Sequence, residues 1–213
     1  MKIQWNGHAC FFIEGKEGRV LTDPYAEAVP YDLMTTEADV VTVSHGHDDH
    51  NATHRVQGSR SVIDGVGEFR IDGIPLLGIA SFHDDEEGTK RGPNNMYAFT
   101  LDGIRVAHLG DLGGPLNDEQ REALSDVDVL LIPVGGFYTI DAAQALEITR
   151  SLPSVRVVIP MHYKTDRIQD WPIDTVEPFV SIVDNARQIG SPQVTLTRED
   201  LPKAPEVWIL DYA

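Results

Sequence analysis

A buried strand that runs directly into a cluster of metal-binding side chains is the feature that most constrains this fold. Residues 38–44 read Ala-Asp-Val-Val-Thr-Val-Ser, and the next six residues read His-Gly-His-Asp-Asp-His. Imidazole nitrogens and carboxylates are donors that zinc and similar divalent ions prefer. His45 and His47 can serve one ion, while Asp49 and His50 can turn back toward a second. The sequence therefore predicts a metal centre at the end of a strand.

Charge and composition narrow the class of protein. The 213 residues include 34 acidic and 17 basic side chains, which gives a formal net charge of −17. Two divalent ions would bring this charge only to about −13. Such a field repels nucleic acid, whose phosphates dominate its affinity for proteins, so we expect a small-molecule partner.

No apolar run suits a membrane span, and the first residues lack a secretory signal. A single cysteine, Cys10, excludes an internal disulfide. We expect a cytoplasmic protein with one domain over residues 1–213.

Apolar patterns predict many strands and few helices. We expect strands at 2–6, 10–14, 19–22, 38–44, 60–64, 68–71, 74–80, 96–101, 104–108, 127–134 and 155–161. Asp102-Gly103 predicts a hairpin between two of these runs. We expect helices at 117–124, 141–151 and 175–189, and another from residue 49 to about residue 56. Asn117 and Gln120 resemble a capping pair at the first of these helices. The patterns indicate an α/β or α+β fold.

Several motifs follow one another in an order typical of a known family. They are Gly7-His8-Ala9, Asp23-Pro24, the 45–50 motif, His83, Asp111 and His162. This order resembles the metallo-β-lactamase superfamily, and within it the small single-domain hydrolases that include the ascorbate-phosphate lactonases. The resemblance implies a four-layer αββα sandwich with metals at the edge between two sheets.

The resemblance also implies two metal sites. Site one would hold His45, His47 and His83, site two would hold Asp49, His50 and His162, and Asp111 would bridge the two ions. Asp49 and Asp111 are the expected catalytic carboxylates. Two ions that share a water can lower its pKa toward about 7 and supply hydroxide. Zinc is the first expectation for this nitrogen-rich set, and manganese, nickel and iron are alternatives.

Nine further side chains are candidates for contacting the substrate or supporting the metal ligands. They are His8, Asp23, Lys90, Arg91, Asn94, Asn95, His108, Tyr138 and Lys164. Asp23 could accept a hydrogen bond from a ligand histidine. Cations near a metal site suggest recognition of a carboxylate or phosphate, which arginine can bind through two parallel hydrogen bonds. The alternative role of the cations is to balance nearby acidic residues.

These features predict a metal-dependent hydrolase that uses a metal-bridged hydroxide on a small ester, lactone or phosphoester. One alternative is a phosphodiesterase or nuclease of the same superfamily. The other is a metal- or ligand-binding module without turnover. The sequence predicts neither the oligomeric state nor which small molecule is the substrate.

Overall fold

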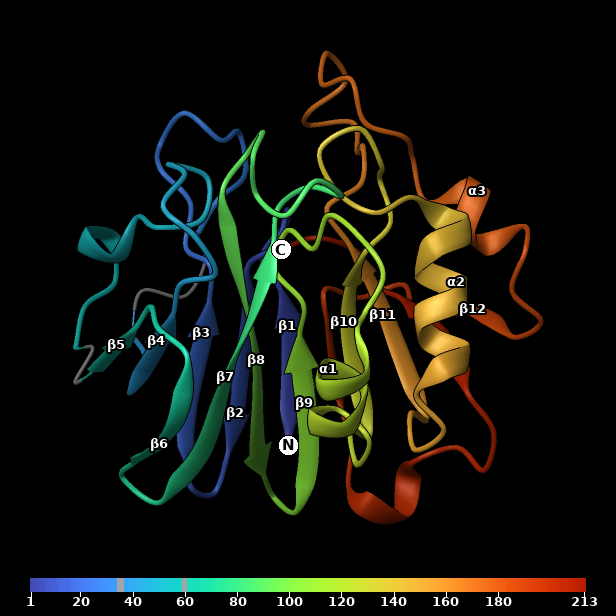
Figure 1. Cartoon of the computed structure of the whole chain (residues 1–213). Helices are drawn as coiled ribbons and strands as arrows, with labels where there is room; N and C mark the ends of the chain where they lie inside the picture. Colours follow the sequence, from blue (N-terminus) through green and yellow to red (C-terminus); the bar gives the residue numbers. More distant parts are fainter. Residues whose placement is uncertain (34–36, 59–60) are drawn as a thin grey trace.

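Two β-sheets form the centre of the computed structural model, which describes residues 1–33, 37–58 and 61–213 (Figure 1). The first sheet has the order β13 (Gln193–Thr195), β1 (Lys2–Trp5), β2 (Phe11–Gly15), β3 (Gly18–Thr22), β4 (Val40–Thr42), β5 (Ser61–Ile63). The second sheet has the order β12 (Ala186–Gln188), β14 (Glu206–Ile209), β11 (Val157–Met161), β10 (Val129–Pro133), β9 (Ile104–His108), β8 (Pro93–Leu101), β7 (Ile74–Phe82), β6 (Gly67–Ile71). This mixed two-sheet architecture confirms the predicted fold class.

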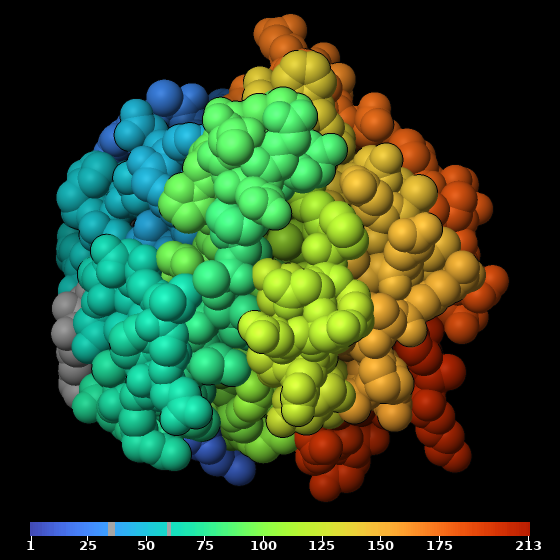
Figure 2. Space-filling model, in the orientation of Figure 1, coloured from blue at the N-terminus to red at the C-terminus, as the bar shows by residue number. Residues whose placement is uncertain are grey.

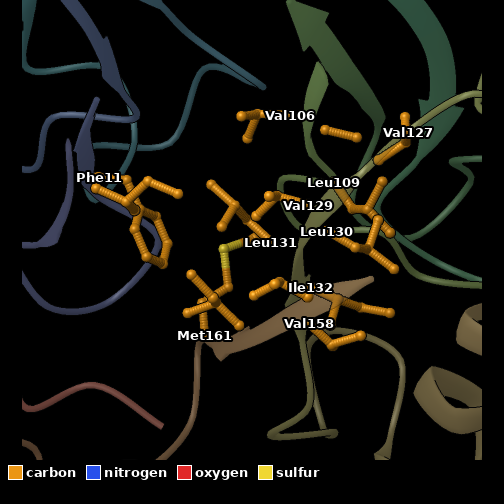
Figure 3. Packing of buried hydrophobic residues seen from close by; sticks show 14 of the residues in the cluster. Phe11, Val106, Leu109, Val127, Val129, Leu130, Leu131, Ile132, Val158 and Met161 are labelled. Carbon is orange, nitrogen blue, oxygen red and sulfur yellow. The ribbon is translucent and has the colours of Figure 1, made fainter. Parts of the chain in front are cut away.

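The main core lies between the two sheets. Every residue of β10 and β11 is buried, as expected for strands covered on both faces. Figure 3 shows Phe11 of the first sheet facing Leu131 and Met161 of the second sheet. Burial of this apolar surface is the main stabilising term that holds the sheets together.

Helices lie beside one part of the second sheet. Figure 1 shows α1 (Asp118–Ala123) and α2 (Ala142–Ser151) next to β9, β10 and β11, with α3 (Glu177–Val180) close to α2. Asn117 and Gln120 form a reciprocal capping box at the start of α1, as predicted. Asp141 and Gln144 form the same arrangement at α2. The helices expected at 117–124 and 141–151 are therefore confirmed.

Loops cover the outer face of the first sheet. A second apolar cluster joins Phe12, Leu21 and Val41 of the sheet to side chains from two loops, including Tyr25 and Ile168. The helix expected from residue 49 to about residue 56 is wrong, because only a 3-10 turn, η1 (Thr53–Arg55), forms there. The backbone N–H of Ala52 instead donates to the carbonyl of Pro24, which draws this segment away from a helical path.

The helix expected at 175–189 is also wrong over most of its length. Only α3 is helical, and residues 186–188 form β12 in parallel pairing with β14. The sequence patterns also missed β13 and β14. The hairpin at Asp102-Gly103 is confirmed by the pairing of Leu101 with Ile104. Residue 60, at the start of the strand expected over 60–64, lies outside the described residues.

The loops that follow several strands gather at one end of the molecule. In Figure 1 they form the upper end, and Figure 2 shows the green loop around residues 83–92 and the yellow loop around residues 134–141 on the surface there. Among the described residues, no helix has the length and apolar character needed to cross a membrane. The expected metal ligands all belong to this gathered set of loops or to the strand ends beneath them.

Candidate metal centre

Strand ends from both sheets bring histidine and aspartate side chains together. The 45–50 motif follows β4 of the first sheet, while His83, Asp111 and His162 follow β7, β9 and β11 of the second sheet. The donor atoms form three groups, each with all its atoms within 4.8 Å of one another. The groups are His45, His47 and His83; His8, Asp49, His50 and His162; and His45, His50 and Asp111. The structure thus places all seven expected ligands in one cluster and adds His8 to them.

Asp111 lies between the two histidine-rich groups. Its Oδ2 atom is 3.2 Å from Nε2 of His83 and 3.1 Å from Nε2 of His162. Its Oδ1 atom is 3.4 Å from Nε2 of His50. One carboxylate therefore contacts side chains from both groups, which is the position that a bridging ligand requires.

Asp23 fixes the orientation of two histidines from behind. It accepts hydrogen bonds from the Ser44 amide at 2.8 Å, the Ser44 hydroxyl at 2.6 Å and Nδ1 of His50 at 2.8 Å. The Ser44 oxygen in turn lies 2.9 Å from Nδ1 of His45. These contacts turn the Nε2 atoms of His45 and His50 toward the cluster, as outer hydrogen-bond partners do for metal-binding histidines. Sequence analysis identified Asp23 as a candidate but missed Ser44.

The donor set is suited to a cation. Nε2 of His45 lies 3.0 Å from Nδ1 of His47, and Nε2 of His8 lies 3.2 Å from Nε2 of His50. Neutral ring nitrogens at such distances direct lone pairs toward one another unless a proton or a metal ion lies between them. Among the described atoms, the buried Oδ1 of Asp111 has no hydrogen-bond partner. Buried polar atoms are normally paired, so these atoms fit the coordination of a divalent ion.

Burial and charge set the protonation of the cluster. Burial lowers the pKa of His8 to about 4 and that of His45 to about 3, so both rings are neutral near pH 7 and can offer a lone pair. Burial opposes ionisation of Asp111, but His162 and His50 hold the pKa of that carboxyl well below its usual range. Burial likewise acts to lower the pKa of His50, and Asp111 and Asp23 outweigh it and raise that pKa. The negative carboxylates therefore favour a positive charge among them.

Strained backbone supports the same side chains. His8, Asp23 and His162 adopt φ values of 53°, 40° and 50°, a left-handed conformation that is uncommon for residues other than glycine. The carbonyl of His8 accepts hydrogen bonds from Trp5 Nε1 at 3.0 Å and from the amide of His162 at 3.2 Å. Such strain persists only where surrounding structure enforces it, and it concentrates at functional sites.

Gly110 is required next to Asp111. Its φ is 55°, and a Cβ atom there would lie 2.4 Å from Oδ1 of Asn94 and 2.5 Å from Cβ of Ser44. Any side chain would collide with the residues that position Asp111 and His45.

A cavity of about 330 Å³ opens over the cluster. It is lined by His47, Asp49, His83, Arg91, Asp111, Tyr138, His162, Asp170, Trp171 and Pro172. Arg91 and Tyr138 were expected near a substrate. Asp170, Trp171 and Pro172 were missed, since nothing in their sequence distinguishes them from an ordinary loop. The loop reaches the cavity because Trp171 packs edge-on against His8 at 5.2 Å.

Five other candidates lie away from this cavity. They are Lys90, Asn94, Asn95, His108 and Lys164. Lys90 is paired with Glu86 at 2.7 Å, and Lys164 lines a different cavity. His108 is buried and uses both ring nitrogens, because Nε2 donates to the Ala9 carbonyl at 2.8 Å and Nδ1 accepts from the Gly110 amide at 3.2 Å. This arrangement gives His108 a structural role.

Asn94 supports Asp111 from inside the protein. It is fully buried, its Nδ2 atom donates to Ser81 Oγ at 2.7 Å and to the Leu109 carbonyl at 3.0 Å, and its Oδ1 atom accepts from the Asp111 amide at 2.9 Å. Asn95, the next residue, is half-buried and donates to the carbonyl of Asp64 at 2.9 Å.

We expect Asn94→Ala to lower the free energy of unfolding by about 1–3 kcal/mol, because it leaves the Asp111 amide and the Leu109 carbonyl buried without a partner. Asn95→Ala is the matched control and should change the free energy of unfolding by about 0.5 kcal/mol or less. Urea denaturation of both variants measures the difference. Equal effects would show that the amide of Asn94 does not support this loop.

Comparisons with known proteins agree with the geometry of the cluster. Residues 2–162 match the model of the β-lactamase superfamily domain. A UPF0173 metal-dependent hydrolase of Thermoplasma acidophilum is 30% identical over 191 residues, covering 78% of this chain and 84% of that protein. A UPF0173 metal-dependent hydrolase of Archaeoglobus fulgidus is 33% identical over 196 residues, again covering 78% of this chain and 84% of the relative.

A solved structure from Thermotoga maritima extends the similarity to the whole chain. That protein is described as a candidate zinc-dependent hydrolase of the metallo-β-lactamase superfamily. It is 36% identical, with a TM-score of 0.84, and the match covers 100% of this chain and 99% of the other. The chain therefore belongs to the metallo-β-lactamase superfamily, and within it to the UPF0173 metal-dependent hydrolases.

Proposed function

We propose that this metal-dependent hydrolase is binuclear and cleaves a small ester, lactone or phosphoester with water. The observation that carries the proposal is the position of Asp111, whose carboxylate contacts histidines of both donor groups within 3.4 Å. A single metal site would not need a carboxylate in this shared position.

The two groups divide the proposed ligands. Site one would be held by His45, His47 and His83, and site two by Asp49, His50 and His162, with Asp111 shared between them. His8 belongs to the second group and is its additional candidate ligand. Zinc is the proposed metal because nitrogen donors predominate, and manganese, nickel or iron would suit a histidine and carboxylate set as well.

The bound ions would polarise the scissile carbonyl or phosphoryl group and bring the pKa of a water near neutrality. The chain's own contribution is to hold the ligand side chains in place and to set their charge. Asp49 lines the cavity, and its Oδ2 atom lies 3.1 Å from Nε2 of His8. Burial opposes ionisation of Asp49, but His8 and His50 lower its pKa, so the carboxylate is ionised near pH 7 and can offer its charge to a metal ion.

The shape of the cavity favours a small substrate. A volume of about 330 Å³ is at the lower end for ligand pockets. Tyr138, Trp171 and Pro172 form an apolar wall, while the histidines and aspartates of the cluster form the polar part. The net charge of −17 disfavours nucleic acid, which argues against the nuclease alternative.

Arg91 is the proposed recognition residue for an anionic group on the substrate. Its guanidinium donates to the Phe137 carbonyl at 3.1 Å and lies 5.5 Å from the centre of the Tyr138 ring. It makes no ion pair with any carboxylate of the described residues, despite the strongly acidic composition. The Arg91 backbone is held in place because its amide donates a hydrogen bond to the Asp84 carboxylate at 2.7 Å. Free guanidinium donors at the cavity therefore suit a carboxylate or phosphate.

Metal-loaded protein should hydrolyse generic ester, lactone or phosphodiester substrates, and Asp111→Asn should reduce turnover by about 10²-fold or more. The amide keeps the shape of the side chain but loses its charge and one metal-binding oxygen. Asp48→Asn, an exposed neighbour of Asp49, is the matched control and should keep wild-type activity. Wild-type turnover in the Asp111→Asn variant would show that Asp111 is not a ligand shared by two metal ions. Absence of turnover on the whole panel would instead favour a binding module.

Arg91→Ala should raise KM for an anionic ester by about tenfold or more and leave a neutral ester of similar size nearly unchanged. Lys90→Ala removes the neighbouring cation, which is already paired with Glu86, and should leave both substrates unaffected. Steady-state kinetics on the anionic and the neutral ester measures both KM values for each variant. Equal effects of Arg91→Ala on both esters would reject charge recognition by this side chain.

A further inference from the structure

The loop that carries Arg91 has no apolar side chain of its own to hold it in place. Residues 84–91 read Asp-Asp-Glu-Glu-Gly-Thr-Lys-Arg and belong to the connection between β7 and β8 on the surface of the molecule (Figure 2). Both ends of this loop reach the cavity over the cluster, because His83 and Arg91 line it. Loops with few apolar contacts open easily. Whatever fixes this loop therefore decides where Arg91 lies.

One buried carboxylate organises the loop. Asp84 is 4% exposed, and its Oδ1 atom accepts hydrogen bonds from the amides of Glu86 and Gly88, each at 2.9 Å. Its Oδ2 atom accepts from the amides of Lys90 at 3.0 Å and Arg91 at 2.7 Å. Hydrogen bonds to an ionised acceptor are stronger than those between neutral groups. The loop is thus wrapped around a single carboxylate that takes the place of an apolar core.

The backbone of Asp84 is itself packed against the loop between β9 and α1. A Cβ atom on Gly113 would lie 2.2 Å from the amide nitrogen of Asp84 and 2.4 Å from its Cα atom, so only glycine allows this contact. The Gly113 amide also donates to the carbonyl of Phe82 at 2.9 Å. At the base of the loop, the His83 amide donates to the Gly92 carbonyl at 3.0 Å. Asp84 therefore holds the loop from a fixed point beside the metal centre.

The side chain of Arg91 extends from this fixed backbone to the loop around residues 134–141. Its guanidinium donates to the Phe137 carbonyl and lies over the Tyr138 ring. Arg91 is thus held at its backbone by Asp84 and at its head by the second loop. A guanidinium that is ordered in advance loses less conformational entropy when it binds an anion.

We propose that Asp84 is a positioning residue for substrate recognition, because its carboxylate fixes the loop so that Arg91 meets an anionic group of the substrate in one orientation. The inference rests on the proposed role of Arg91 in recognition. Asp84 does not line the cavity, so it acts through Arg91 and does not contact the substrate. The next three acidic residues, Asp85, Glu86 and Glu87, are exposed, so Asp84 is the carboxylate of this acidic run that is placed inside the loop.

Asp84→Asn tests the loop directly, because an amide nitrogen replaces one acceptor oxygen and leaves two backbone N–H groups without a partner. Asp85→Asn is the matched control, since the Asp85 side chain is 70% exposed. In substrate-free protein, amide exchange over residues 84–92 should be about tenfold faster or more in Asp84→Asn, and nitrogen relaxation should show a more mobile Arg91 guanidinium. The control should match the wild-type chain within about twofold. Unchanged exchange and mobility in Asp84→Asn would overturn the proposal.

Kinetics on the same variants separates positioning of Arg91 from damage to the neighbouring ligand His83. Asp84→Asn should raise KM for an anionic ester by about threefold to tenfold, with little effect on kcat, on KM for a neutral ester or on metal content. The double variant with Arg91→Ala should show no higher KM for the anionic ester than Arg91→Ala alone, because both substitutions remove one interaction. Equal losses on both esters, a lower metal content or additive effects would each reject the positioning role.

The recognition role of Arg91 and the positioning role of Asp84 fail in different ways. If Arg91→Ala does not distinguish the two esters, charge recognition by Arg91 is rejected, and the substrate role of Asp84 is rejected with it. If Arg91→Ala distinguishes the esters and Asp84→Asn does not, only the role of Asp84 is rejected.

Discussion

The carboxylate of Asp111 lies at the centre of the structural account. It is 2% exposed, and a buried carboxylate is stable only where positive charge or hydrogen bonds compensate for the loss of water. Three histidines surround it, and two of them come from different strands of the second sheet. In the absence of a metal ion, the raised pKa of His50 supplies the compensating proton. A divalent ion supplies positive charge without a proton, so metal binding and protonation compete at this position.

The rest of the fold holds these groups at one edge. The 45–50 motif comes from the first sheet and His83, Asp111 and His162 from the second, so packing of the two sheets is a condition for the cluster. Asp23 holds His50 of the motif through a hydrogen bond to its Nδ1 atom. Asn94 holds the backbone of Asp111 through a hydrogen bond from the Asp111 amide. The left-handed backbone at His8, Asp23 and His162 is strain that this packing enforces.

The sequence could predict the ligands because each follows an apolar strand, and strand ends of packed sheets meet at shared edges. It could not separate Asn94 from Asn95, because only the pairing of β8 decides which of two neighbouring side chains is buried. Trp171 carries no local signal, since its place depends on how a long loop packs on His8. The pattern at 175–189 favoured a helix, but pairing with β14 outweighs local propensity at residues 186–188.

The metal content of the chain tests the central claim most directly. Protein purified without chelator and saturated with zinc or manganese should contain about two ions per chain by elemental analysis, because the donor set exceeds one tetrahedral site. Asp111→Asn, measured in parallel, should retain fewer ions than the wild-type chain. A fully saturated preparation that never exceeds one ion per chain, with the same content in Asp111→Asn, would contradict a binuclear centre bridged by Asp111.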